Sequence, residues 1–455
     1  MNWTKEHGKI FSTLIAELVK ANIRYFILRN YEELPNGNSA KDVDILIEPS
    51  RINDANNIIQ DVFKRCQLTH QSLARFIQLY CWHGMDVNNH LSIHIDLIGG
   101  YRVKGYEVFT FDELYEHTIE YNGLKVLDRY YEALMVFIYK QFGYKKPKLK
   151  QDYKDIIYNT LENFPEFSSD LQKLLGKSLT TEIIKCISQK DFDKMLTYTK
   201  DVTSKLKWYS FRKAPMKVAY RVLDVFWQKF YTIIIKRQIN GRSFALIAPD
   251  GAGKTTFLDA LLKETAFYYV AEPSLFHLFH FRPEILPNLG AVGEKAGIAK
   301  QDKNFTTPHR AKPAGFISSV VRITYYWIDY VIGWFLYTTR DIQYDRITVF
   351  DRYSYDMLVD PHRTRLGLPY WLRKMFVSFM PHPKFTFYLD VEPEEIYRRK
   401  QELSPNEINR QVAEYHKLVK TSNRFITLNG NRRVEEITRD AIVVVLDTFC
   451  KRIKD

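Results

Sequence analysis

The residues most able to do chemistry form a short glycine-rich stretch, Ala248-Pro-Asp-Gly-Ala-Gly-Lys-Thr255. Its spacing is that of a phosphate-binding loop, with alanine where glycine more often begins the pattern. Gly251 and Gly253 can adopt backbone angles closed to other residues, so successive N–H groups around Ala252 point inward and form an anion-binding nest. A nest of this kind at the start of a helix is a phosphate site.

Three residues that follow the nest supply chemistry that backbone groups lack. Lys254 is expected to reach the β and γ phosphates of ATP, Thr255 to ligate Mg²⁺, and Thr256 to join the nucleotide-binding set. The context fits, because the apolar strand FALIA precedes the loop and the amphipathic helix TTFLDALLKE follows it. A glycine-rich turn that binds no nucleotide is the plainer alternative.

A second apolar segment, ITVFDR at residues 347–352, ends in a charged pair. Asp351, at the end of a buried strand, is placed to hold Mg²⁺ or its water opposite Thr255. Arg352 beside it can grip the anionic oxygens of a phosphoryl acceptor. For each residue the alternative is a structural ion pair at a strand end.

A cluster of basic residues follows in a charged helix. Arg398 and Arg399 lie one turn into that helix, with Lys400 beside them and Arg410 further on. Mobile guanidinium groups there would clamp the charge that develops between phosphoryl donor and acceptor. Arginines on a helix surface are usually just solvated, so this prediction depends on the loop and Asp351 for its context.

Three carboxylates in the first part of the chain form another candidate site. Asp42 and Asp44 are two apart in one strand, so they point to the same face, and Asp96 from a neighbouring strand can complete a cation site. Carboxylates grouped in this way bind Mg²⁺ for nucleotidyl transfer by the two-metal scheme. The alternatives are a degenerate binding or scaffolding domain, or solvated aspartates at a strand edge.

Histidines near these carboxylates invite a zinc interpretation. His83, His90 and His94 lie close together in the sequence, but no pair of cysteines at zinc-site spacing supports them, so no zinc site is assigned. The four cysteines of the chain, at positions 66, 81, 186 and 450, are scattered without paired spacing. That pattern fits a reducing compartment better than a disulfide framework.

The elements that must position the carboxylates are short strands among helices. Residues 25–30, 42–47 and 92–98 have strand-like apolar patterns, and residues 112–205 are predicted to be helical. Residues 206–240 then have apolar positions at helical spacing with basic residues interleaved. They predict a linking amphipathic helix or a basic surface helix, with ordinary core packing as the alternative.

The phosphate loop belongs to a region in which strands and helices alternate. The expected helices are 254–264 and 316–339, and the expected strands are FALIAPD, 347–352, 385–391 and 424–430. Strands separated by helical crossovers indicate a mostly parallel sheet with helices on both faces. Residues 316–337 are apolar over the length of a membrane span, but they contain Arg322 and Asp329 on one helix face, which favours a buried or groove-lining helix.

Composition limits the partners and the compartment. The chain of 455 residues is 45% hydrophobic and 26% charged, as in globular proteins. Its formal net charge of +13 implies an anionic partner, with a solvated basic face that has no partner as the alternative. Its first 20 residues lack a signal-peptide core, so a cytoplasmic location is expected. The basic surface leaves open peripheral association with the inner face of the membrane or with an assembly machinery there.

The segments around the phosphate loop resemble thymidylate kinases. The likeness is carried in order by LIAPDGAGKTTFLDALL, VFDRYSYDMLVD, FTFYLDVEPEEIYRRKQEL and ITLNGNRRVEEITRDAI, which span nearly all of residues 241–455. The resemblance implies that adenine packs against the loop holding Asn429. It also implies that Asp250 occupies the position of an acidic residue near the acceptor, where it contacts an acceptor hydroxyl; a structural turn aspartate is the alternative.

One departure from the family bears on the acceptor. An insertion of about 80 residues lies between the loop helix and VFDRY, where a thymidylate kinase has a compact pyrimidine site. The chain is similar to a divergent branch of thymidylate-kinase-like proteins encoded beside bacterial surface-polysaccharide genes. That resemblance implies a glycan or glycan precursor as acceptor, with candidate contacts His280, Arg282, Asp360, His362 and Arg363.

The first part of the chain is similar to a minimal nucleotidyltransferase module. YFILRNYEELPNGNSAKDVDILIEP and the later HIDLIGG carry the Asp-x-Asp and third Asp of that family. The usual Gly-Ser pair before the carboxylates is absent, and LRNYEELP stands there instead. The resemblance therefore supports the fold more than the activity.

The sequence predicts an α/β enzyme of two modules. Residues 1–205 are expected to form an α+β nucleotidyltransferase-like domain with a helical extension, residues 206–240 a link, and residues 241–455 a P-loop kinase domain using ATP and Mg²⁺. A dTMP-type nucleoside monophosphate kinase and a nucleotide-binding assembly or switch protein without an acceptor are the rival functions. No nucleic-acid module is recognised, so nucleic acid is not an expected partner, and the oligomeric state is not assigned.

Overall fold

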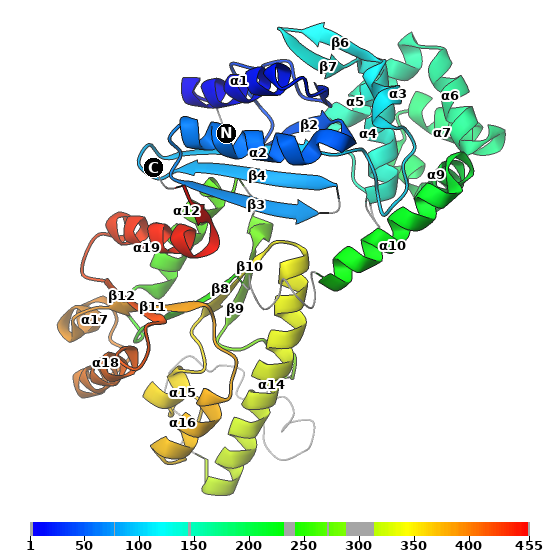
Figure 1. Ribbon diagram of the computed structural model, residues 1–455. Helices are drawn as coiled ribbons and strands as arrows, with labels where there is room; N and C mark the ends of the chain where they lie inside the picture. The colour runs from blue at the N-terminus through cyan, green and yellow to red at the C-terminus, as the bar shows by residue number, and fades with distance from the viewer. Residues whose placement is uncertain are drawn as a thin grey trace. The chain divides into compact units, whose positions relative to one another are not determined.

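The computed structural model divides the chain into two compact units (Figure 1). The first unit comprises Met1–Lys229 and Arg452–Asp455, and the second unit comprises Phe230–Lys451. Each unit has a β-sheet and a hydrophobic core of its own. The structure describes residues 3–76, 78–143, 147–231, 242–270, 273–287 and 314–453.

The sheet of the first unit mixes parallel and antiparallel neighbours. Its strands are β1 (Tyr25–Ile27), β2 (Val43–Ile47), β3 (His70–Phe76), β4 (Leu79–Asp86), β5 (Leu91–Ile98), β6 (Thr118–Tyr121), β7 (Leu124–Leu127) and β13 (Lys451–Arg452). Their order across the sheet is β13-β3-β4-β5-β2-β1-β7-β6. β2 is parallel to β5 and antiparallel to β1, while β5 is antiparallel to β4. The strand that carries Asp44 therefore lies beside the strand that carries Asp96.

Side-chain alternation along β2 and β5 separates a core face from a polar face. Ile45 and Ile95 join the core that also contains residues of the two helices α1 (Lys5–Lys20) and α2 (Ile52–Arg65). Because successive residues of a strand point to opposite faces, Asp44 and Asp96 lie on the other side of the sheet. Leu46 is on that side too, where it joins a smaller core.

Helices complete the first unit. They are α1 (Lys5–Lys20), α2 (Ile52–Arg65), α3 (Phe111–Tyr115), α4 (Arg129–Gly143), α5 (Gln151–Asn163), α6 (Glu166–Leu175), α7 (Lys177–Ser188), α8 (Phe192–Thr197), α9 (Thr199–Lys213) and α10 (Pro215–Tyr231). α4 to α9 share a core of their own, which makes the helical extension of the unit. A domain boundary at residue 205 would fall inside α9, and the two compact units divide after Lys229.

The prediction that residues 112–205 are all helical is wrong in one place. β6 and β7 form an antiparallel hairpin there, joined by Asn122 and Gly123. Both residues have positive φ, at 49° and 73°. That geometry suits a two-residue hairpin turn, for which Asn-Gly is the strongest short-range signal. The helical interpretation overlooked this dipeptide.

The second unit has the expected parallel sheet. Its strands are β8 (Ser243–Ile247), β9 (Phe276–His280), β10 (Ile347–Asp351), β11 (Phe385–Asp390) and β12 (Phe425–Asn429), in the order β12-β11-β8-β10-β9. Every pair of neighbouring strands in it is parallel. The described helices of at least four residues are α12 (Lys254–Tyr268), α14 (Phe316–Gln343), α15 (Asp356–Val359), α16 (Tyr370–Ser378), α17 (Pro393–Arg399), α18 (Pro405–Val419) and α19 (Val434–Phe449). The predicted α/β class is confirmed, and both predicted helices extend a few residues further.

The long helix α14 packs one side on the second unit and exposes the other. Ile323 and Tyr330 are fully buried in its core, whereas Ile317 and Phe335 are exposed. Asp329 is fully buried and is satisfied by Arg282 and by backbone N–H groups. Among the described helices, none combines the length and apolar character needed to cross a membrane.

Candidate active site

The chemistry-bearing residues of the second unit gather at one edge of its sheet. Parallel strands present their carboxyl ends at the same edge, which is where ligands bind in open α/β sheets. In register, Asp351 of β10 pairs with Leu246 of β8 on one side and with His280 of β9 on the other. The glycine-rich loop leaves β8 two residues after Leu246, so it begins beside Asp351.

The loop has the backbone shape that a phosphate nest requires. Gly251 and Gly253 have φ of +85° and +89°, and α12 begins at the next residue, Lys254. A Cβ atom at Gly251 would lie 3.1 Å from the Cβ of Lys400 and 3.2 Å from the carbonyl oxygen of Ile396. Glycine is therefore needed here both for the backbone angle and for the close approach of α17.

Lys254 is folded back over the loop. It is 8% exposed, and its Nζ donates to the carbonyl oxygens of Ala248 at 2.9 Å and Pro249 at 2.7 Å. Burial, and then the nearby charge of Arg352, hold the pKa of the Lys254 ammonium well below its usual range. A phosphate at the loop would add negative charge beside this desolvated ammonium.

Asp250 holds two arginines, a role that the sequence did not indicate. Arg352 Nη2 donates to its Oδ1, and Arg363 Nη2 donates to its Oδ2. Lys254 Nζ is 3.7 Å from the same Oδ1. Both carboxylate oxygens are thus engaged, so this geometry favours a positioning role over direct contact with an acceptor hydroxyl.

Arg352 is buried in a network of charged and polar groups. It is 4% exposed, and its Nη1 donates to Asp356 Oδ2 at 2.6 Å while Tyr415 donates its hydroxyl to Asp356 Oδ1 at 2.9 Å. Burial alone would lower the pKa of the Arg352 guanidinium, but Asp356 raises it above its usual value. Its φ of 71° is unusual for a residue other than glycine, and such outliers cluster at functional sites.

Asp351 is placed as a cation ligand would be. Its Oδ2 lies 3.0 Å from Nδ1 of His280, whose side chain is 69% exposed. Its Oδ1 is buried and has no hydrogen-bond partner among the described residues. Burial works to raise the pKa of Asp351, but His280 and Lys254 bring it below its usual value. An ionised carboxylate oxygen with no protein donor fits Mg²⁺, which prefers oxygen ligands.

The arginine pair of α17 divides into an inward and an outward member. Arg399 Nη1 donates to the carbonyl oxygen of Ala252 at 3.2 Å, and its Nη2 donates to that of Gly430 at 3.3 Å. Both arginines pair with Glu395, but the Arg398 side chain is 77% exposed whereas that of Arg399 is 33% exposed. The structure therefore brings Arg399 to the phosphate loop and leaves Arg398 on the surface. Arg410 lies on α18, where it pairs with Glu407.

The remaining predicted residues of this site differ in their surroundings. Arg282 is 7% exposed and its Nη1 donates to Asp329 at 2.8 Å, so the ion-pair alternative accounts for it. Thr255, Thr256, His362 and Asn429 are exposed. Asn429 ends β12, where its Oδ1 accepts from the backbone N–H of Asn431 at 3.0 Å.

In the first unit the three predicted carboxylates do come together. Asp44 and Asp96 are register partners on β2 and β5, and carboxylate oxygens of Asp42, Asp44 and Asp96 lie within 4.8 Å of one another. Arg29 Nε donates to Asp44 at 2.7 Å, so one carboxylate already has a cationic partner. Burial raises the pKa of Asp44 above its usual value; the charge of Arg29 opposes this shift and the nearby Asp42 carboxylate adds to it.

Comparisons with known proteins assign the chain to no family. No model of a known protein family matches the chain, and no curated protein matches it either. Among solved structures, thymidylate kinase from Ehrlichia chaffeensis is 14% identical, with a TM-score of 0.31, over 45% of this chain and 99% of that chain. A likeness of this size says nothing about the activity of this chain.

Proposed function

We propose that the second unit is an ATP-dependent phosphotransferase that moves the γ-phosphoryl group of ATP to an acceptor oxygen. The observation that carries the proposal is the meeting of the loop nest and Asp351 on adjacent parallel strands, with Asp351 Oδ1 buried and lacking a partner among the described residues. A nest alone would suit any anion. A nest beside an available carboxylate suits a nucleotide that carries a divalent cation.

The residues at the carboxyl edge of the second sheet would have different roles in phosphoryl transfer. Loop N–H groups from Gly251 to Thr255 would hold the phosphates, and Lys254 would turn from the loop carbonyls to the β and γ phosphates. Thr255 and Asp351 would hold Mg²⁺, which neutralises charge on the transferred group when it is bound. The acceptor hydroxyl oxygen would form a bond to the γ phosphorus as the bond from that phosphorus to the β-γ bridging oxygen breaks. ADP would leave with the electron pair of the broken bond, and the hydroxyl proton would pass to solvent.

For the acceptor we propose a glycan or glycan precursor of surface polysaccharide synthesis. This rests on the sequence resemblance and on two groups at the sheet edge, His280 beside Asp351 and Arg363 beside Asp250. Asp360 lies 3.7 Å from Arg363, and His362 is a further candidate from the sequence. Asp250 would act by fixing Arg352 and Arg363, whose guanidinium groups attract anionic acceptor oxygens. A pyrimidine nucleoside monophosphate is the main rival acceptor, because the same two arginines also suit a phosphate.

A screen with γ-labelled ATP tests the proposal. Intact protein is incubated with sugars, sugar phosphates, lipid-linked glycans and nucleoside monophosphates, and the label in each acceptor is compared with background hydrolysis. Transfer to a glycan class supports the full proposal, and robust transfer to dTMP replaces the glycan with a nucleotide. Hydrolysis without transfer to any acceptor would favour a nucleotide-dependent switch.

The inward and outward arginines of α17 give a matched pair of variants. Arg399→Ala is expected to lower kcat by about 10² to 10³-fold, since it removes a guanidinium aimed at the phosphate loop. Arg398→Ala, which removes a solvated neighbour with the same charge, is expected to change kcat less than about threefold. Steady-state rates with saturating ATP measure both, and equal losses in the two variants would contradict the assignment.

A second candidate function belongs to the first unit. The register of Asp44 with Asp96 supports a cation-assisted nucleotidyl transfer of the kind that the sequence suggested. The Arg29 bond to Asp44 and the missing Gly-Ser pair support a non-catalytic relative instead. An Asp42→Ala/Asp44→Ala double variant distinguishes a nucleotidyltransferase from a non-catalytic relative. If transfer of a labelled nucleoside monophosphate is unchanged in the double variant, these carboxylates do not catalyse it.

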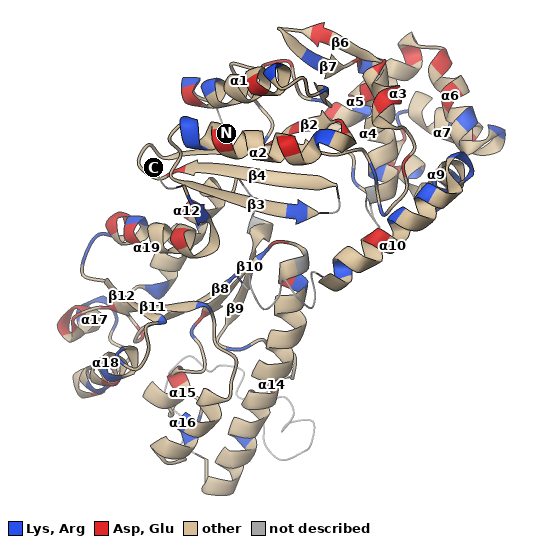
Figure 2. Cartoon of the chain, viewed as in Figure 1, with Lys and Arg blue, Asp and Glu red and all other residues tan. Residues whose placement is uncertain are grey.

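We also propose that α10 docks on an anionic membrane surface. Met216, Tyr220, Leu223 and Phe226 follow helical spacing along it and are between 66% and 82% exposed. Basic residues recur along α9 and α10 (Figure 2), among them Arg212, Lys217 and Lys229. An exposed apolar stripe with basic neighbours is typical of a helix lying in an anionic lipid interface. Each basic residue near such a surface adds about 1 kcal/mol.

Vesicle sedimentation tests this docking. Protein is expected to bind vesicles that contain anionic lipid, to bind zwitterionic vesicles much less, and to dissociate as salt is raised. A Met216→Ser/Leu223→Ser/Phe226→Ser variant should lose most of this binding, whereas Val19→Ser, an exposed apolar residue on α1, should not. If the triple variant instead alters only the oligomeric state, the stripe is covered by a second copy and the lipid proposal fails.

A further inference from the structure

The polar face of the first sheet carries a set of metal-ligand side chains that the sequence interpretation did not assemble. In register, Asp96 of β5 has Asp44 of β2 on one side and Cys81 of β4 on the other. Two residues along, His94 of β5 faces His83 of β4. Because register partners and residues two apart share a face, all five side chains lie on one side of the sheet.

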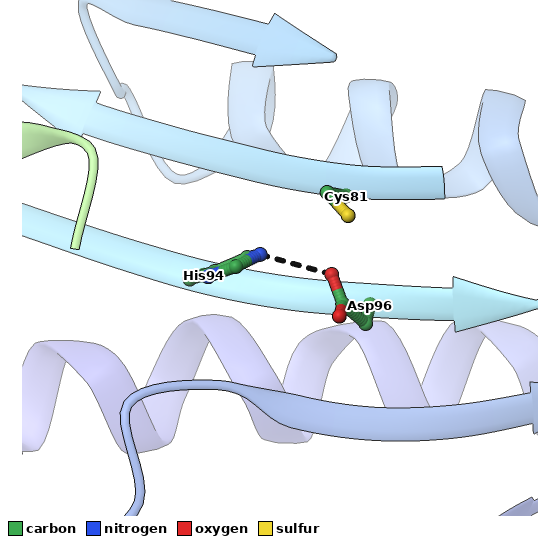
Figure 3. A group of neighbouring side chains, drawn as sticks. All are labelled: Cys81, His94 and Asp96. Carbon is green, nitrogen blue, oxygen red and sulfur yellow. Dashed lines mark hydrogen bonds and ion pairs between the residues drawn. The ribbon is translucent and has the colours of Figure 1, made fainter. Parts of the chain in front are cut away.

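Three of these side chains offer one ligand atom each to a common point (Figure 3). The Cys81 sulfur, a His94 ring nitrogen and an Asp96 oxygen all lie within 4.8 Å of one another. His94 Nε2 and Asp96 Oδ1 are 2.9 Å apart. Bond lengths to a tetrahedral Zn²⁺ imply separations of about 3.3 to 3.6 Å between such ligand atoms.

The surroundings favour a cation at this point. Asp42, Asp44 and Asp96 bring three carboxylates to the patch, and Arg29 pairs with Asp44 from the side away from Cys81's strand. Cys81 and Asp96 are buried, at 8% and 6% exposed, and the His94 side chain is 15% exposed. Buried carboxylates are stable only when they are paired or bind metal.

We propose that Cys81, His94 and Asp96 bind a soft divalent cation, Zn²⁺ foremost. Thiolate and imidazole ligands select zinc over Mg²⁺, whereas the Asp42 and Asp44 side of the patch offers oxygen ligands alone. Asp96 belongs both to the group with Cys81 and His94 and to the group with Asp42 and Asp44. The two groups therefore share one carboxylate but favour different cations, because their other ligand atoms differ. Three protein ligands leave a fourth tetrahedral position for water or a substrate atom, as in catalytic zinc sites.

The proposal does not depend on phosphoryl or nucleotidyl transfer. It also revises the choice of histidines, because His90 lies at the turn between β4 and β5 with φ of 49°, while His94 lies inside β5. Cys81, which lies two residues before His83 on β4, takes the place of His90 as the ligand beside His94. A sequence pattern of cysteine pairs cannot reveal this set, since the ligands come from two strands and only the register aligns them.

Cobalt binding to intact, tag-free protein tests the site. Co²⁺ is expected to bind with a stoichiometry of one and to give the thiolate-to-cobalt charge-transfer band and the strong visible bands of a tetrahedral site. Zn²⁺ should bleach these bands by displacement, and Mg²⁺ in excess should not. Bound Co²⁺ without a thiolate band, or no binding at all, overturns the proposal without any need for a variant.

Variants assign the ligands. Cys81→Ser is expected to abolish the charge-transfer band, and Cys81→Ser and Asp96→Asn should each weaken Zn²⁺ binding more than tenfold in competition with a chromophoric chelator. Cys66→Ser and His90→Asn are the matched controls and should leave both readouts unchanged. Circular dichroism establishes that each variant is folded. Loss of the band in Cys66→Ser, or full Zn²⁺ affinity in a folded Asp96→Asn variant, would place the metal elsewhere.

Discussion

Replacing Lys254 with alanine is expected to lower the rate of phosphoryl transfer by about two to three orders of magnitude while the second unit stays folded. The rate should fall because the ammonium can reach a phosphate at the nest, where a water-poor site strengthens its attraction for developing charge. The fold should survive because the described contacts of Nζ, hydrogen bonds to two carbonyl oxygens and an ion pair with Asp250 at 3.7 Å, all lie within its own loop. The lowered pKa of Lys254 shows that burial already disfavours the charged ammonium there.

The control for this variant is Lys263→Ala, an exposed lysine on the same helix α12. Steady-state kinetics with labelled ATP should show the loss in kcat for Lys254→Ala alone, and thermal unfolding should leave both variants near the wild-type midpoint. Full transfer activity in Lys254→Ala would remove the loop from the mechanism. A loss of folding together with activity would mean that the ammonium is a structural group.

Replacing Arg352 with methionine is expected to destabilise the second unit by about 3 to 5 kcal/mol. Methionine keeps much of the side-chain volume but leaves Asp356, which is fully buried, without its cationic partner at 2.6 Å. An uncompensated buried carboxylate is among the most costly changes a core can suffer. Asp250 loses one of its two arginines at the same time, so acceptor binding should fall as well.

Urea unfolding of the full chain, followed by hydrogen exchange of peptides from each unit, measures this change for the second unit separately. Arg398→Met, on the exposed side of α17, is the matched control and should cost less than about 0.5 kcal/mol. An Arg352→Met/Asp356→Asn double variant should recover part of the loss, because the buried charge is removed together with its partner. A loss below 1 kcal/mol in Arg352→Met would show that Asp356 is satisfied without it.

Local patterns allowed most of the second unit to be predicted. The phosphate loop is contiguous, so its glycines, its lysine and the flanking strand and helix could be recognised together from residues 243–268. Strand-terminal Asp351 could be placed opposite the loop because parallel strands end at a common edge. In the first unit, the hairpin of β6 and β7 was missed although its Asn-Gly turn is an equally local signal. The helical pattern in the residues around it dominated the interpretation.

Which side chains form ion pairs across the fold could not be predicted in the same way. Asp250 finds Arg352 and Arg363, which lie 102 and 113 residues away, and Arg282 finds Asp329, 47 residues away. Arg398 and Arg399 are adjacent and chemically identical, yet only Arg399 turns to the loop. Each outcome depends on how elements pack, and residue type carries no information about packing partners so distant along the chain.

The sequence by itself determined the α/β class of the second unit, the phosphate loop and the candidate ligands Asp351, Asp42, Asp44 and Asp96. Those features follow from residue type and short spacing, which act through backbone angles and strand alternation. The tertiary structure alone decided that Asp250 holds two arginines, that Arg282 is a buried pair, and that Cys81 stands beside Asp96. The physical reason is that strand register and helix packing are set by burial summed over a whole unit, which no short stretch contains.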